Sequence, residues 1–88
     1  MSRPTTNDPE TLALQALAAT LTDERRALRF LELTGIAVDD LRSRAADADT
    51  LAALFGFLEA YEPDLLAVAG ELGVPPQELV AAGQALAR

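Results

Sequence analysis

The stretch Gly35-Ile36-Ala37-Val38-Asp39-Asp40-Leu41 decides the fold, and a related stretch, Gly73-Val74-Pro75-Pro76-Gln77-Glu78-Leu79, follows 38 residues later. Each has a glycine, a β-branched residue, three residues typical of turns or caps, an acid and a leucine. Glycine adopts the left-handed conformation that closes many helices, and acids favour the first turn of the next helix. The pattern therefore predicts two sharp corners between helices. Gly35 and Gly73 close the first helix of each corner, and Leu41 and Leu79 lie on the second.

The composition favours a single all-helical domain. The chain has 88 residues, half of them hydrophobic and mainly Leu and Ala, with few aromatic residues. Leu and Ala are strong helix formers, whereas strands favour β-branched and aromatic residues. Residues 1–7 are polar and predict a flexible N-terminal tail, and residues 8–88 predict one domain.

Capping residues and prolines divide the domain into six predicted helices. The expected starting points, in chain order, are Asp8-Pro9, a cap at Thr22, Asp39 or Asp40, Asp47 or Asp49, Pro63, and Pro76. Helices 1 to 3 align with helices 4 to 6, which predicts a compact six-helix bundle built from two related three-helix units with helix-turn-helix-like corners. Two units are too few for a solenoid.

Apolar spacing predicts which faces are buried. The first helix carries a stripe of Leu14, Leu17, Ala18 and Leu21 at helical spacing. The fourth is apolar almost all round and is therefore expected at the centre of the bundle. Its second face carries the small residues Ala52, Gly56 and Ala60, which we expect to admit a close neighbour.

The net charge of −7 is unevenly distributed. Residues 45–88 carry seven acids and a single arginine, which either attract a basic partner or simply keep a small apolar protein in solution. The whole surface is expected to repel nucleic acid and anionic lipid. We expect no membrane partner, since the uncharged stretches are too short to span a bilayer. The basic residues that cluster are Arg25, Arg26, Arg29, Arg42 and Arg44. They form either an interaction surface or a solvated face paired with Asp23, Glu24 and Glu32.

The residue types argue against catalysis. The chain has no His, Cys or Lys, which removes the usual general base, thiol nucleophile and Schiff-base amine. Asp47-Ala48-Asp49 resembles the start of a calcium loop, but Ala52 and Leu58 stand where the loop needs a glycine and a bidentate glutamate. We therefore expect a non-enzyme with no metal and no cofactor, located in the cytoplasm.

Three functions remain open. The first is a protein–protein interaction or regulatory module, which uses surplus apolar surface and a patch formed by Phe57 and Tyr61; a homodimer is a further expectation. The second is a helix-turn-helix-like regulator of nucleic acid, which the shortage of cations around the predicted corners disfavours. The third is a binder of a small apolar ligand, held between the fourth and fifth helices.

The run Arg29-Phe30-Leu31-Glu32-Leu33-Thr34-Gly35-Ile36, followed by Leu41-Arg42 and by Phe57-Leu58-Glu59, resembles a family of short bacterial proteins, domain-of-unknown-function family 3572. The resemblance covers most of residues 9–87. It implies an all-helical, cytoplasmic, bacterial protein with no assigned activity, and it carries over no functional residues.

Overall fold

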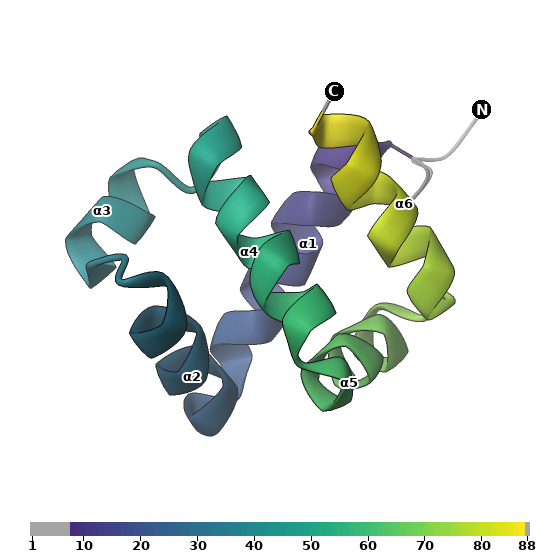
Figure 1. Cartoon of the computed structure of the whole chain (residues 1–88), viewed down its shortest axis with the longest axis horizontal. Helices are drawn as coiled ribbons and strands as arrows, with labels where there is room; N and C mark the ends of the chain where they lie inside the picture. The colour runs from purple at the N-terminus through teal and green to yellow at the C-terminus, as the bar shows by residue number, and fades with distance from the viewer. Residues whose placement is uncertain (1–7, 88) are drawn as a thin grey trace.

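The computed structural model describes residues 8–87, which form six α-helices (Figure 1). In chain order they are α1 (Pro9–Thr22), α2 (Glu24–Thr34), α3 (Val38–Ser43), α4 (Ala48–Ala60), α5 (Glu62–Leu72) and α6 (Pro76–Leu86). This confirms the all-α class and the six-helix bundle. The predicted tail, residues 1–7, lies outside the described residues. No described helix has the length and apolar character needed to cross a membrane.

Acidic caps begin three of the helices. The Asp8 carboxylate accepts a hydrogen bond from the backbone N–H of Thr11 at 2.9 Å, and Asp47 precedes α4. The predicted cap at Thr22 is wrong: Thr22 is the last residue of α1, and the Asp23 carboxylate accepts from the N–H of Arg26 at 3.0 Å. The third helix begins at Val38 rather than at Asp39 or Asp40, because the extended backbone of Ala37 already allows the helix to start.

Both predicted glycine corners are present. Gly35 and Gly73 have the same positive φ of 73° and close α2 and α5, and their N–H groups donate to carbonyls of the last turn. Leu41 and Leu79 are buried, as the pattern predicts.

Two crossing helices form the middle of the molecule. In Figure 1, α1 and α4 cross at the centre, with α2 and α3 on one side and α5 and α6 on the other. Each of the central helices contacts α2, α5, α6 and the other central helix. The fourth helix is thus central as predicted, but it shares that place with α1.

The predicted inward stripe of α1 is wrong in part. Leu17 is buried, but Leu14, Ala18 and Leu21 are exposed. The face that the neighbouring helices cover instead carries Leu12, Ala13, Ala16, Ala19 and Thr20. Small residues on this face let those helices approach α1 closely.

The predicted row of small residues on α4 does not face a neighbour either. Ala52, Gly56 and Ala60 are exposed, and a Cβ placed on Gly56 would meet nothing within 4 Å. The large residues Leu51, Leu54, Phe55 and Leu58 fill the inward face of α4.

The two predicted three-helix units differ in their third helix. The third helix of the second unit, α6, has 11 residues and packs against α1, α4 and α5. Its counterpart α3 has 6 residues and lies at the edge of the molecule (Figure 1). This difference leaves one side of α1 uncovered near α3.

Candidate functional site

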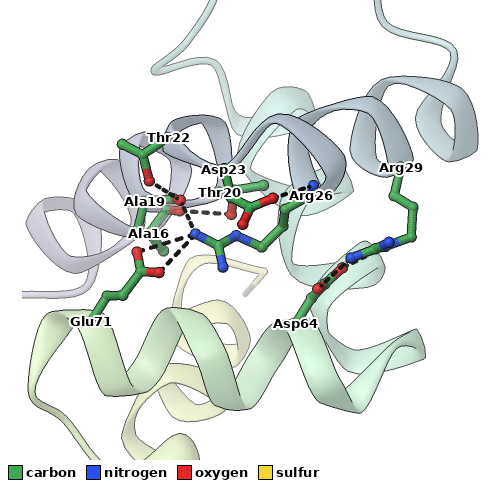
Figure 2. A network of polar contacts seen from close by, with 9 residues as sticks. All are labelled: Ala16, Ala19, Thr20, Thr22, Asp23, Arg26, Arg29, Asp64 and Glu71. Carbon is green, nitrogen blue, oxygen red and sulfur yellow. Dashed lines mark hydrogen bonds and ion pairs between the residues drawn. The ribbon is translucent and has the colours of Figure 1, made fainter.

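A charged seam joins α2 to α5 at the side of the bundle (Figure 2). We use the name α2–α5 seam for its four residues, Arg26, Arg29, Asp64 and Glu71. Arg26 and Arg29 lie one turn apart on α2, and Asp64 and Glu71 lie two turns apart on α5. The helices run so that Arg26 pairs with Glu71 and Arg29 with Asp64.

Arg26 is the buried member of the first pair, with only 4% of its surface exposed. Its Nη2 donates to the carbonyl oxygen of Ala19 at 2.6 Å and to both carboxylate oxygens of Glu71 at 3.0 and 3.1 Å. Its Nε is buried without a hydrogen-bond partner among the described residues. A guanidinium buried with one donor unsatisfied reduces stability unless its pair compensates.

Arg29 makes the second pair with a two-pronged contact. Its Nε and Nη2 donate to the two carboxylate oxygens of Asp64 at 2.9 and 2.8 Å. These hydrogen bonds raise the pKa of Arg29, which stays fully charged. The guanidinium also lies 4.8 Å from the ring centre of Tyr61. Asp64 is buried in the first turn of α5, where the helix dipole also favours its negative charge.

The structure divides the predicted basic cluster. Arg25, Arg42 and Arg44 are exposed and form no ion pair within residues 8–87. The solvated-face interpretation is wrong for Arg26 and Arg29, because their side-chain partners are acids of α5 rather than Asp23, Glu24 or Glu32. Asp64 was missed because an acid in the first turn of a helix is explained by the helix dipole alone, and Glu71 was missed because no local pattern links it to an arginine 45 positions earlier.

The predicted Phe57–Tyr61 patch is also divided. Phe57 is buried, and its ring packs edge-to-face against Phe30 with the ring centres 5.6 Å apart. The side of α4 that carries Phe57 faces α2, which explains its burial. Tyr61 is exposed beside Arg29.

An apolar groove lies between α1, α2 and α3. We name it the α1–α3 groove, and its volume is about 330 Å³. The residues that line it are Leu17, Leu21, Leu31, Val38, Leu41, Arg42 and Ala45. Leu17 and Leu41 are buried at its base, whereas Leu21 and Val38 are exposed at its edge. This is the side of α1 that the short α3 leaves uncovered, and it carries part of the leucine stripe that the sequence predicts to be core.

A second hollow lies between α2 and α4. Its volume is about 420 Å³, and its lining includes Leu33, Gly56 and Ala60. Neither this hollow nor the α1–α3 groove lies between α4 and α5, where the sequence predicts a ligand pocket.

The described residues contain no cluster of metal ligands, and the corner at Gly73 presents no cation on its second helix. Within residues 8–87, no group of three or more acids could hold a metal ion. The corner at Gly73 presents α6 as its second helix, and the exposed residues of α6 are Gln77, Ala81, Gln84 and Ala85. A helix face without a cation makes poor contact with phosphates.

The comparisons with known proteins give a family and no function. The model of a family described as "Protein of unknown function (DUF3572)" matches residues 6–88, nearly the whole chain. No curated protein and no solved structure matches.

Proposed function

Because the chain belongs to the DUF3572 family, whose description assigns no activity, we infer its function from the structure and propose that it is a protein-interaction module without catalysis. The observation that carries the proposal is surplus apolar surface. Seven large hydrophobic side chains of the described residues are 36–66% exposed. In a domain this small, apolar side chains gathered along a groove are typical of a surface that binds another protein.

The position of these side chains favours a binding surface over a core that is too poorly packed to cover them. The inner core is well filled, since Leu12, Phe30, Leu54, Leu58 and Leu79 are almost completely buried. Leu21 and Val38 lie on the α1–α3 groove, and Leu33 lies on the hollow between α2 and α4. Three of the seven exposed side chains, Leu21, Leu33 and Val38, therefore flank concave surfaces next to a completed core.

The chemistry of the described residues supports a role without catalysis. The charged groups with the closest contacts, those of the α2–α5 seam, pair with each other and hold two helices together. The chain contains no histidine, cysteine or lysine to act as a base or nucleophile.

Affinity capture with quantitative mass spectrometry tests the proposal. The wild-type protein is used as bait in a lysate of the organism that encodes it, and light scattering measures self-association in parallel. We expect a stoichiometric partner or a defined oligomer. A variant with exposed leucines replaced at both concave surfaces, Leu21→Asn with Leu33→Asn, is expected to lose it.

The matched control is Leu28→Asn, because Leu28 is 55% exposed and lines neither concave surface. The control is expected to retain the partner. The absence of any stoichiometric partner, together with a strictly monomeric protein, would refute the proposed function.

A further inference from the structure

We propose that the α1–α3 groove binds an amphipathic helix of another protein, and that a carboxylate of this helix pairs with Arg42. The inference rests on the proposed function and names the surface and the chemistry of the partner. A helix that lies in an apolar groove typically anchors itself by side chains at positions i, i+3 or i+4, and i+7. The groove has the composition for such anchors, since six of its seven lining residues are apolar.

The open shape of the groove favours the side chains of a helix over an enclosed ligand. Its volume of about 330 Å³ lies within the range of about 300–1,000 Å³ for small-molecule clefts, so the volume alone does not distinguish the two. The groove is open at the edge, where 36% of Leu21 and 49% of Val38 are exposed. A row of apolar side chains on a helix can fill such a groove while the helix backbone stays outside it.

The charge of the groove selects the partner. Among residues 8–87, Arg42 is the only charged residue that lines it. Its guanidinium has no ion-pair partner within residues 8–87, in contrast to Arg26 and Arg29. A helix that covers the groove would remove water from Arg42, and a carboxylate on that helix would compensate for the loss. Complementary charge at the edge of an interface gives specificity as well as attraction.

A second copy of the chain does not provide this helix. Two grooves placed face to face are both concave, so they leave the space between them unfilled. The exposed large apolar residues of the described helices also form no second stripe of three outside the groove: Leu14 is the only one on α1, Leu28 and Leu33 lie on different sides of α2, and Leu66 is the only one on α5. The first seven residues contain a single large apolar side chain, Met1, which is too few for three anchors.

The test uses a display library of helices of about 18 residues, or five turns, randomised along one face. The wild-type protein selects peptides from it, and the affinity of the best peptide is measured for each variant. We expect selected peptides to carry apolar residues at helical spacing and an acid near one end. Val38→Asn, and separately Leu21→Asn, should each weaken binding at least about tenfold, since each removes a large apolar contact.

Charge reversal provides the decisive arm. We expect Arg42→Glu to lower the affinity for the acidic peptide about tenfold. The same variant should bind a peptide whose acid is changed to arginine more tightly than the wild-type protein does. The matched controls are Leu66→Asn, with the same 49% exposure as Val38, and Arg44→Glu, an exposed arginine two residues away that does not line the groove. Both should leave binding within about twofold of wild type. Far-UV circular dichroism of each variant checks that it is still folded.

Each other outcome overturns the inference. Failure to enrich any helix, or binding that survives Val38→Asn and Leu21→Asn, excludes this groove as the site. An unchanged affinity in Arg42→Glu excludes the acidic partner. A small apolar molecule found in the groove by native mass spectrometry, or a dimer lost in the groove variants, identifies a different occupant. In these cases the proposed function survives if lysate capture still yields a stoichiometric partner, so the two failures are distinguishable.

Discussion

Replacing Arg26 with methionine would remove a buried charge while keeping a similar side-chain volume, and we expect the protein to lose no stability. Arg26 is 4% exposed, and its Nε has no partner among the described residues (Figure 2). One unsatisfied buried donor costs about 1–3 kcal/mol, and replacing a buried ion pair by apolar residues is often neutral or stabilising.

The partners that Arg26→Met leaves behind stay satisfied. The carbonyl of Ala19 also accepts a hydrogen bond from the Thr22 hydroxyl at 2.8 Å. The side chain of Glu71 is 48% exposed, so water can hydrate it. The capping bond to Asp23 uses the backbone N–H of residue 26, which methionine keeps. We therefore expect a free energy of unfolding between the wild-type value and about 2 kcal/mol above it.

Removing the other partner should have the opposite effect. Glu71→Ala leaves the guanidinium of Arg26 buried with one remaining acceptor, the carbonyl of Ala19. A charge-assisted hydrogen bond is worth about 1.5–3 kcal/mol, and we take the lower part of this range because Glu71 is half exposed. The expected loss is about 1.5 kcal/mol, or about 6–12 °C in Tm for a domain of this size.

Urea unfolding followed by far-UV circular dichroism measures both values, and the double variant completes the cycle. Once Arg26 is methionine, Glu71→Ala should cost less than about 0.5 kcal/mol, because no buried charge remains to be orphaned. The reasoning fails if Arg26→Met costs more than about 1 kcal/mol, or if Glu71→Ala costs the same in both backgrounds.

Three further changes test other parts of the fold. Gly83→Ala should lower the free energy of unfolding by about 1–3 kcal/mol, because the new Cβ would lie 2.6 Å from Cγ of Phe55. Gly56→Ala, on the open face of α4, should raise it by about 0.5–1 kcal/mol. Thermal unfolding of both variants checks that the two effects have opposite signs. Gly35→Ala should cost about 1–2 kcal/mol by urea unfolding although nothing lies within 4 Å, since a φ of +73° is strained for any residue with a Cβ. The hydrogen bond from the N–H of Arg26 lowers the pKa of Asp23 below 3.8. The contribution of this carboxylate to stability is therefore complete above pH 3.8 and is lost as the pH falls through the lowered pKa. Asp23→Asn should make the free energy of unfolding less dependent on pH below about 4, and an acid-unfolding profile unchanged from wild type would contradict this.

The sequence predicts the corners of this fold better than its faces. Gly35 and Gly73 were identifiable because a positive φ is a local requirement that few residues meet. The inward face of α1 was not identifiable, since alanine-rich and leucine-rich faces compete for burial and only the neighbouring helices decide between them. Here they cover Ala13 and Ala16 and leave Leu14 exposed.

The functional residues show the same limit. A row of arginines on one helix predicts a charged face, but the sequence does not say which arginine will find an acid far along the chain. Arg26 reaches Glu71 across 45 positions, and Arg29 reaches Asp64 across 35. The α1–α3 groove was missed for a related reason: Leu21 was interpreted as core, whereas it is exposed at the edge of the groove beside the short helix α3.

The α2–α5 seam also explains how one orientation of α2 is selected. The apolar residues of this helix, Ala27, Leu28, Phe30, Leu31 and Leu33, span an arc too wide for all of them to be buried, so more than one rotation about its axis would bury part of the set. A rotation by one residue, about 100°, would move Arg26 and Arg29 away from their acids and leave Asp64 buried without its partner. In the observed rotation, both pairs form and Phe30 enters the core. The same rotation places Leu31 on the α1–α3 groove and turns Leu28 outward. The ion pairs between α2 and α5 and the burial of Phe30 therefore favour the same rotation, which leaves Leu31 to line the groove.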